Sequence, residues 1–168
     1  MAIVTTASAG MKAAARATIL QVRDPLSSAR TIEQEAASLV ATSPVPVVVS
    51  SRCDIALAAG AAGVNLPEND LPVAVARALM GERLVGRSVH SLESALRAEG
   101  EGADYVIFGP VWASASHPAS APAGIEALAE VARALRIPVI AIGGVTEGRI
   151  AECHAAGAAG YAAIGMFE

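Results

Sequence analysis

The sequence predicts an α/β fold in which eight parallel strands alternate with helices. Short runs rich in β-branched residues recur along the chain, and stretches with apolar residues at helical spacing separate them. Several of these runs are almost continuously apolar, as in Val45–Val49 and Pro138–Ile142. Such runs are typical of strands buried on both faces, which belong to parallel sheets. Eight strands in regular alternation with helices favour a (β/α)8 barrel, the TIM barrel.

The strands are expected in eight short segments of the chain. These are Ala2–Thr5, Thr18–Arg23, Val45–Ser50, Gly63–Leu66, Leu84–Ser88, Asp104–Gly109, Pro138–Gly143 and Gly160–Ile164. A doubly wound open sheet is the alternative. It would place a glycine-rich fingerprint after the first strand, where Thr5–Ser8 has none.

The helices between the strands are marked by caps and glycines. They are expected at Ser27–Thr42 with Ser27 or Ser28 as cap, at Leu71–Leu79 after an Asp70 cap with Pro72 in the first turn, from Ser91 to Gly100–Gly102, at Ile125–Arg136 and at Glu147–Ala156. Two positions depart from a regular barrel. The stretch Ala9–Ala17 allows only about two helical turns, and no helix follows the eighth strand. The prediction is therefore a short barrel with a stunted first helix and a missing eighth.

Length and composition predict one domain over residues 1–168 and exclude several classes of protein. The chain is 54% hydrophobic and 17% charged, which excludes a disordered protein. A net charge of −4 without a basic patch argues against nucleic-acid binding. No apolar run is long enough to span a membrane, and no basic residue precedes Lys12 as a signal peptide requires, so a cytoplasmic protein is expected. Cys53 and Cys153 form no CxxC motif and are expected to be buried thiols.

In a TIM barrel the functional site lies at the carboxyl ends of the strands. This rule selects Gln21 and Arg23, then Ser50–Asp54, Asn65–Asp70, Arg87–His90, Gly109–Gly124, Gly143–Gly144 and Gly165. The glycines after strands seven and eight are the most informative, because loops there often bind phosphate. Bare backbone at Gly143, Gly144 and Gly165 would let amide groups approach an anion. The alternative is that these glycines only relieve crowding.

Several polar side chains near these strand ends are candidates for chemistry. The loop 110–123 contains Ser114, Ser116 and His117, which either hold a phosphate or lie on a solvated surface. His90 is a candidate acid or base, unless it caps the next helix or packs under the loop. Arg23 is expected to point into the mouth of the site and to suit phosphate. The carboxylates that suit Mg²⁺ are Asp70 and Asp54, the latter more simply a helix cap.

Motifs at the strand ends carry a resemblance to a known family. The segments are Gly86–Glu93 followed by Gly102–Val111, together with Ile137–Val145, Leu20–Arg23 and Asp54–Leu57. From about Leu20 to the end, the chain resembles the thiamine-phosphate synthase and thiazole tautomerase (TenI) family, and is closer to the TenI branch. The resemblance implies a (β/α)8 barrel. Synthases of this family join a hydroxymethylpyrimidine diphosphate to a thiazole phosphate with Mg²⁺. The tautomerases shift a double bond in a thiazole carboxylate phosphate without metal.

The resemblance also implies roles for individual residues. Gln21 and Arg23 match positions that bind the pyrimidine diphosphate, with Ser88 a further diphosphate contact. Ser114 and Ser116 stand at flap threonines and Asp70 at a magnesium ligand. Gly144 falls in the thiazole-phosphate loop, and Gly165 stands where a serine is usual. The chain departs from the synthase pattern at three places: Pro25 and His117 replace lysines, and Ser50–Ser51 replaces Asn-Asp. Pro110 replaces the catalytic histidine of the tautomerases.

We therefore predict a TenI-like protein that binds a thiazole phosphate or thiamine phosphate, acts as a tautomerase and needs no cofactor. Gly143, Gly144 and Gly165 would anchor the phosphate, Arg23 would hold the carboxylate, and His90 or His117 would move the proton. The alternatives are a thiamine-phosphate synthase, which would use Mg²⁺ at Asp70, and a ligand-binding regulatory protein without activity. A homodimer is expected, because the short helices would leave apolar barrel surface uncovered.

Overall fold

The computed structural model describes residues 1–114 and 121–167. It contains eight parallel strands paired in sequence order, which confirms the predicted barrel and excludes the doubly wound alternative. β1 and β8 meet at a single bridge between Ala2 and Ala163, so the barrel is nearly closed. The strands are β1 (Ala2–Val4), β2 (Leu20–Val22), β3 (Val47–Ser50), β4 (Gly63–Leu66), β5 (Leu84–Val89), β6 (Tyr105–Phe108), β7 (Val139–Ile142) and β8 (Gly160–Ala162).

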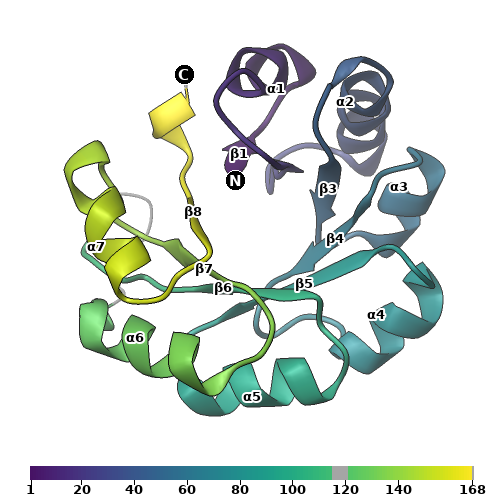
Figure 1. Cartoon of the computed structure of the whole chain (residues 1–168). Helices are drawn as coiled ribbons and strands as arrows, with labels where there is room; N and C mark the ends of the chain where they lie inside the picture. The colour runs from purple at the N-terminus through teal and green to yellow at the C-terminus, as the bar shows by residue number, and fades with distance from the viewer. Residues whose placement is uncertain (115–120, 168) are drawn as a thin grey trace.

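Helices surround this ring of strands on the outside (Figure 1). They are α1 (Ala7–Ala13), α2 (Ala29–Thr42), α3 (Cys53–Ala58), α4 (Val73–Met80), α5 (Leu92–Gly100), α6 (Gly124–Ala134) and α7 (Ile150–Ala155), with short 3-10 turns η1 (Glu147–Arg149) and η2 (Gly165–Phe167). The first helix is indeed short, and the described chain ends in η2 after β8. Arg16 reaches across to this terminal segment and donates to the Met166 carbonyl at 3.4 Å.

The caps explain where most helices begin. Ser28, one of the two predicted caps of α2, is the observed cap: its hydroxyl accepts a hydrogen bond from the Thr31 amide. Ser91 and Ser94 form a reciprocal capping box at the start of α5. The Asp70 cap predicted for α4 is wrong, because that helix begins at Val73, whose amide donates to the Glu101 carboxylate instead.

A second predicted cap also differs in the structure. Asp54 lies inside the first turn of α3, where it forms an exposed ion pair with Arg52. Arg52 occupies the N-cap position of α3 and forms no side-chain cap bond. Asp54 therefore contributes a favourable charge near the helix N-terminus rather than a cap.

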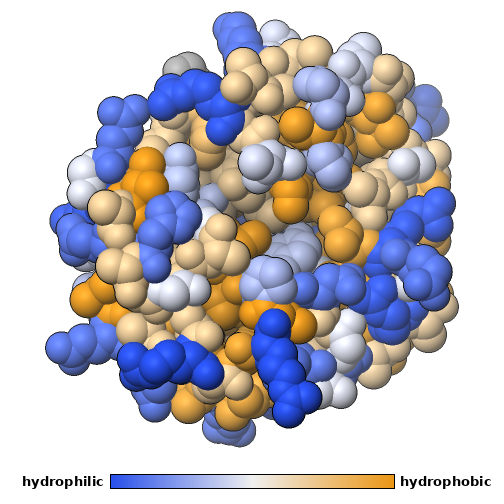
Figure 2. Space-filling view, in the orientation of Figure 1, coloured by the Kyte–Doolittle hydropathy of each residue, from blue (hydrophilic) through white to orange (hydrophobic). Residues whose placement is uncertain are grey.

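Buried apolar side chains form two clusters that follow from strand alternation. One cluster lies between the sheet and the helices and includes Leu20, Val64 and Phe108. The other fills the barrel interior and includes Val48 and Tyr105. Figure 2 shows that strongly hydrophilic side chains lie mostly toward the periphery of the molecule in the orientation of Figure 1.

Both cysteines are buried and free, as predicted, and burial raises the pKa of each thiol. Within residues 1–114 and 121–167, no helix is long and apolar enough to cross a membrane. Met11 on α1 and Ile164 after β8 are 40% and 43% exposed. The homodimer stays a prediction.

Candidate functional site

A cavity of about 480 Å³ opens at the carboxyl ends of the strands, where the sequence places the site. Eight of the residues with a predicted role line it: Gln21, Arg23, Ser88, His90, Ser114, Gly143, Gly144 and Gly165. Ser116 and His117 lie outside the described residues, so their predicted roles stay predictions. His154 lies on α7 and is not among the cavity residues; its Nδ1 is 3.2 Å from the Ala158 carbonyl oxygen.

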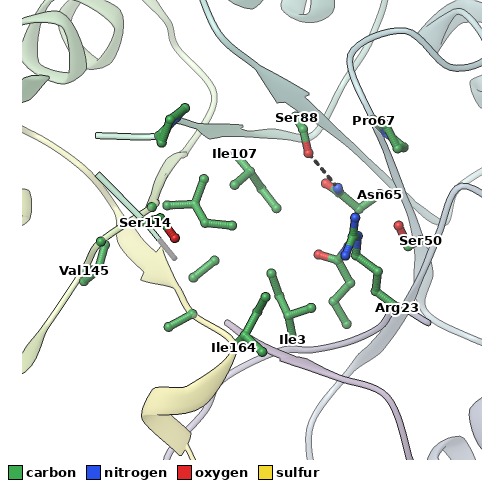
Figure 3. Close-up of a pocket in the computed structure, with 18 of the residues that line it drawn as sticks. Ile3, Arg23, Ser50, Asn65, Pro67, Ser88, Ile107, Ser114, Val145 and Ile164 are labelled. Carbon is green, nitrogen blue, oxygen red and sulfur yellow. Dashed lines mark hydrogen bonds between the residues drawn. The ribbon is translucent and has the colours of Figure 1, made fainter. Parts of the chain in front are cut away.

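The cavity has a polar wall and an apolar wall (Figure 3). Strands β2 to β5 and their ends supply the polar wall, which consists of Gln21, Arg23, Ser50, Asn65 and Ser88. Strands β1, β6, β7 and β8 supply the apolar wall, which includes Ile3, Ile107, Ile142 and Ala162. The arrangement suits a ligand with an apolar ring at one end and an anionic or hydrogen-bonding group at the other.

Two amide side chains in the polar wall are almost fully buried. Gln21 and Asn65 are each 2% exposed. Asn65 donates from Nδ2 to the Ser88 hydroxyl oxygen at 3.1 Å. Among the described residues, Gln21 Oε1 and Asn65 Oδ1 have no hydrogen-bond partner. Buried polar atoms are rarely left unpaired, so these two oxygens mark a place where a ligand or water donates hydrogen bonds.

Arg23 brings a positive charge to the polar wall. It follows β2 directly, and its backbone amide donates to the Val4 carbonyl, which fixes its position at the strand end. In the described part of the chain its guanidinium forms no ion pair. Its fork of donors matches a phosphate or carboxylate, and Figure 3 shows the side chain beside Asn65. Arg23 thus lines the cavity, while its role in holding an anion stays a prediction.

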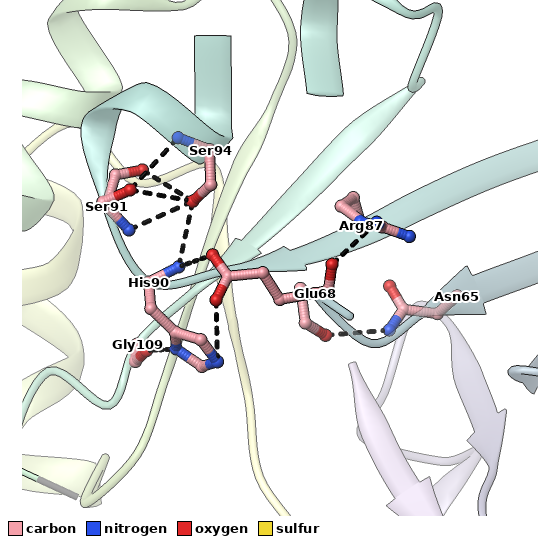
Figure 4. A network of polar contacts seen from close by, with 8 residues as sticks. Asn65, Glu68, Arg87, His90, Ser91, Ser94 and Gly109 are labelled. Carbon is pink, nitrogen blue, oxygen red and sulfur yellow. Dashed lines mark hydrogen bonds and ion pairs between the residues drawn. The ribbon is translucent and has the colours of Figure 1, made fainter. Parts of the chain in front are cut away.

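His90 and Glu68 form a polar pair on the rim of the cavity (Figure 4). The His90 Nδ1 is hydrogen-bonded to the Gly109 carbonyl oxygen, which only accepts, so Nδ1 carries a proton. Its Nε2 faces a Glu68 carboxylate oxygen at 4.0 Å. Ser91, and not His90, caps α5, so the capping alternative for His90 is wrong.

The Glu68 carboxylate is held in its charged form. Burial opposes this charge, but hydrogen bonds from Ser94 and the His90 amide, with the electrostatic attraction of His90 and Arg87, lower the pKa of Glu68 on balance. Arg87 also donates to the Glu68 and Leu71 carbonyl oxygens at 2.7 and 2.8 Å. The loop between β4 and α4 is thereby fixed against β5.

Gly143 and Gly144, which follow β7, lie where neighbouring atoms leave no room for a side chain. Gly143 and Gly144 have φ values of +91° and +64°, which favour glycine. A Cβ on Gly143 would lie 2.5 Å from the Pro110 Cβ, and one on Gly144 would lie 2.6 Å from the Ala113 carbonyl oxygen. Crowding thus accounts for both glycines, as one alternative expected, while both also line the cavity. Their role in phosphate binding stays a prediction, as does that of Gly165.

The carboxylates near the cavity do not fit a magnesium site. Mg²⁺ takes oxygen ligands in octahedral geometry, with one or two carboxylates among them. Asp70 does not line the cavity, and its oxygens accept from the Ser51 hydroxyl and from the Leu71 amide. Among the described residues no group of three His, Cys, Asp or Glu side chains could hold a metal. Glu68 is the only carboxylate that lines the described cavity, and it is turned to His90.

Sequence reasoning named Asn65 and Glu68 only within a strand-end segment and gave neither a role. Strand alternation could have singled out Asn65, because its neighbours Val64 and Leu66 pack toward the helices and Asn65 therefore points into the barrel. No comparable signal marks Glu68, which follows β4 in a loop and meets His90 only through the tertiary structure.

Fold and cavity together define a (β/α)8-barrel protein with a ligand site at the carboxyl ends of its strands. A family model described as thiamine monophosphate synthase matches residues 2–167. The chain belongs to this family of thiamin biosynthesis, as the strand-end motifs predicted.

Curated relatives and a solved structure agree with this assignment. The chain is 40% identical over 152 residues to a thiamine-phosphate synthase of Chloroflexus aurantiacus, covering 88% of this chain and 70% of that protein. It is 44% identical over 163 residues to one of Anaeromyxobacter dehalogenans, covering 96% and 73%. A structure of thiamine phosphate pyrophosphorylase from Pyrococcus furiosus superposes with a TM-score of 0.87 at 30% identity, covering 97% of this chain and 84% of that one. These names match the synthase alternative and give no support to the tautomerase prediction.

Proposed function

We propose that the chain acts as a thiamine-phosphate synthase, joining a pyrimidine diphosphate to a thiazole phosphate in this cavity. The two-walled cavity carries the proposal, because both substrates combine a flat ring with an anionic group. The apolar wall of Ile3, Ile107 and Ile142 would hold the rings. The polar wall, with Arg23 at its mouth, would hold the diphosphate.

The reaction needs little covalent participation by the protein. The bond between the pyrimidine methylene carbon and the diphosphate oxygen breaks, and its electron pair leaves with diphosphate. The thiazole nitrogen then forms a bond to that carbon with its own lone pair, so no proton is transferred. The protein's task is to align the two rings and to stabilise the departing anion. Arg23 supplies a positive charge for this task, and Ser88 supplies a hydroxyl donor.

Since the carboxylates do not fit Mg²⁺, we assign no step to a metal. The test is to incubate the purified chain with both substrates and to measure thiamine phosphate and diphosphate, with and without Mg²⁺. Arg23→Ala is expected to lower the rate about 10²–10³-fold, as loss of a charge-stabilising group does. Arg52→Ala is the matched control, because Arg52 pairs with Asp54 away from the cavity lining and should leave the rate unchanged. Absence of product from the unaltered chain would refute the proposal.

A tautomerase is the second candidate, favoured by the pair of His90 and Glu68 at the rim. A neutral His90 with its proton on Nδ1 offers Nε2 as a base, and Glu68 would stabilise the imidazolium that forms. His90→Gln should then abolish tautomerisation of a thiazole carboxylate phosphate, followed by ultraviolet absorbance. The same change should leave the condensation unaffected, because that reaction moves no proton.

A further inference from the structure

Asn65 and Ser88 form a hydrogen bond across two neighbouring strands inside the cavity. Asn65 lies on β4 opposite Gly86 of β5, and Ser88 comes two residues later on the same inward face. The Asn65 Nδ2 donates to Ser88 Oγ at 3.1 Å, as Figure 3 shows. Asn65 is 2% exposed, so its amide is almost fully buried in the cavity wall.

This bond has a consequence for the single proton of the Ser88 hydroxyl. Because Oγ already accepts from Asn65, the proton is free to point elsewhere. Among the described residues, Asn65 is the only side chain with which Ser88 shares a hydrogen bond. The open direction is the cavity, which Ser88 lines together with Arg23. A hydroxyl fixed in this way is a ready donor to an anion.

We propose that Asn65 is a positioning residue that orients the Ser88 hydroxyl as a donor to the phosphate or diphosphate of the ligand. This inference rests on the proposed function and adds to it a residue that acts through Ser88. An asparagine suits the task because its Nδ2 can only donate. An aspartate at this place would only accept, and it would draw the Ser88 proton away from the ligand.

Gln21 provides a matched control within the same wall. It carries the same amide group, is equally buried at 2% exposed, and has an unpartnered Oε1. It lies on β2 and forms no hydrogen bond with Ser88 among the described contacts. A change at Gln21 therefore alters polarity and packing in the cavity without touching the orientation of Ser88.

The experiment is a double-mutant cycle on the full chain, with inorganic diphosphate and thiazole phosphate as calorimetric probes. Asn65→Leu should weaken binding of at least one probe about tenfold when Ser88 is present, as expected for a hydrogen bond to a charged group. In the Ser88→Ala background the same change should have almost no effect. Gln21→Leu should have an equal effect in both backgrounds. Thermal unfolding of every variant shows that the binding losses occur in folded protein.

A second variant keeps the test decisive if Asn65→Leu does not fold. Asn65→Asp should weaken binding more when Ser88 is present than in the Ser88→Ala background, because reversal of the hydroxyl adds to the charge repulsion. Equal losses in both backgrounds would overturn the positioning role while leaving the proposed function intact. Failure of the unaltered chain to bind either probe would overturn the proposed function and this inference with it.

Discussion

Gly86 lies directly opposite Tyr105 on the neighbouring strand, and the two fit only because Gly86 has no side chain. A Cβ on Gly86 would stand 2.1 Å from the Tyr105 Cζ. The Tyr105 ring belongs to the apolar cluster inside the barrel and is 4% exposed. Burial raises the pKa of its phenol. The packing of the barrel interior therefore depends on this pair of residues.

Gly86→Ala is expected to destabilise the fold by about 1–3 kcal/mol, because the added methyl group overpacks the barrel interior. Urea unfolding monitored by circular dichroism measures this change in the free energy of unfolding. Gly160→Ala is the control, since Gly160 also lies on a strand but a Cβ there would meet nothing within 4 Å. Adding Tyr105→Leu to Gly86→Ala should recover part of the loss. Equal stability of Gly86→Ala and Gly160→Ala would contradict the proposed tight packing between Gly86 and Tyr105.

Gly144 and Gly165 should respond differently to alanine. Gly144→Ala forces a φ of +64° on a residue with a Cβ and brings that Cβ to 2.8 Å from Trp112 Cβ, so a loss of about 1–3 kcal/mol is expected. Gly165→Ala should be tolerated, because nothing lies within 4 Å of its added Cβ. Gly165→Ala thus tests the phosphate role cleanly: calorimetry with thiazole phosphate should show weaker binding at unchanged melting temperature. Unchanged binding would remove Gly165 from the phosphate site.

The fold was predictable because it depends on a pattern repeated along the chain. Apolar runs separated by amphipathic stretches specify a parallel sheet whatever the details of each end. Gly63–Leu66 was predicted with its correct bounds, whereas the predicted Thr18–Arg23 shortened to Leu20–Val22. The start of α4 could not be predicted, because the group that accepts from its Val73 amide is Glu101, which is distant in sequence.

The location of the site could be predicted from the sequence, but most of the contacts within it could not. The strand-end rule found Arg23 and Ser88, because position along a strand decides which side chains reach the mouth. It did not find the bond between Asn65 and Ser88, which depends on the register of β4 against β5. Nor did it show that the Asp70 carboxylate accepts from Ser51, since that contact joins two loops.

Glu68→Gln should reduce stability in a manner that depends on pH. The pKa of Glu68 is lowered from its ordinary value of 4.5, so the folded state favours the carboxylate. This contribution is present above about pH 4.5 and is lost as the pH falls through the lower folded-state pKa. The melting temperatures of Glu68→Gln and the unaltered chain should therefore differ near neutral pH and converge in acid.

Glu93→Gln is the control for this series, because Glu93 is 90% exposed and lies 4.0 Å from Arg97 in a surface pair. Such pairs contribute little to stability, so its melting temperature should stay close to that of the unaltered chain throughout. A difference in melting temperature between Glu68→Gln and the unaltered chain that widened toward acid would show that folding raises, and does not lower, the pKa of Glu68.

Removal of divalent metal should leave binding of thiazole phosphate unchanged, because the Asp70 carboxylate already accepts hydrogen bonds from the Ser51 hydroxyl and the Leu71 amide. Asp70→Asn should behave in the same way: an amide can still accept from the Leu71 amide and can donate to the Ser51 hydroxyl oxygen. Calorimetric titration in a chelator and in millimolar Mg²⁺ measures both cases. Asp54→Asn is the control, since Asp54 pairs only with Arg52 on the outer helix α3 among the described ion pairs. Binding that required Mg²⁺ and failed in Asp70→Asn but not in Asp54→Asn would show that Asp70 leaves Ser51 to hold the metal.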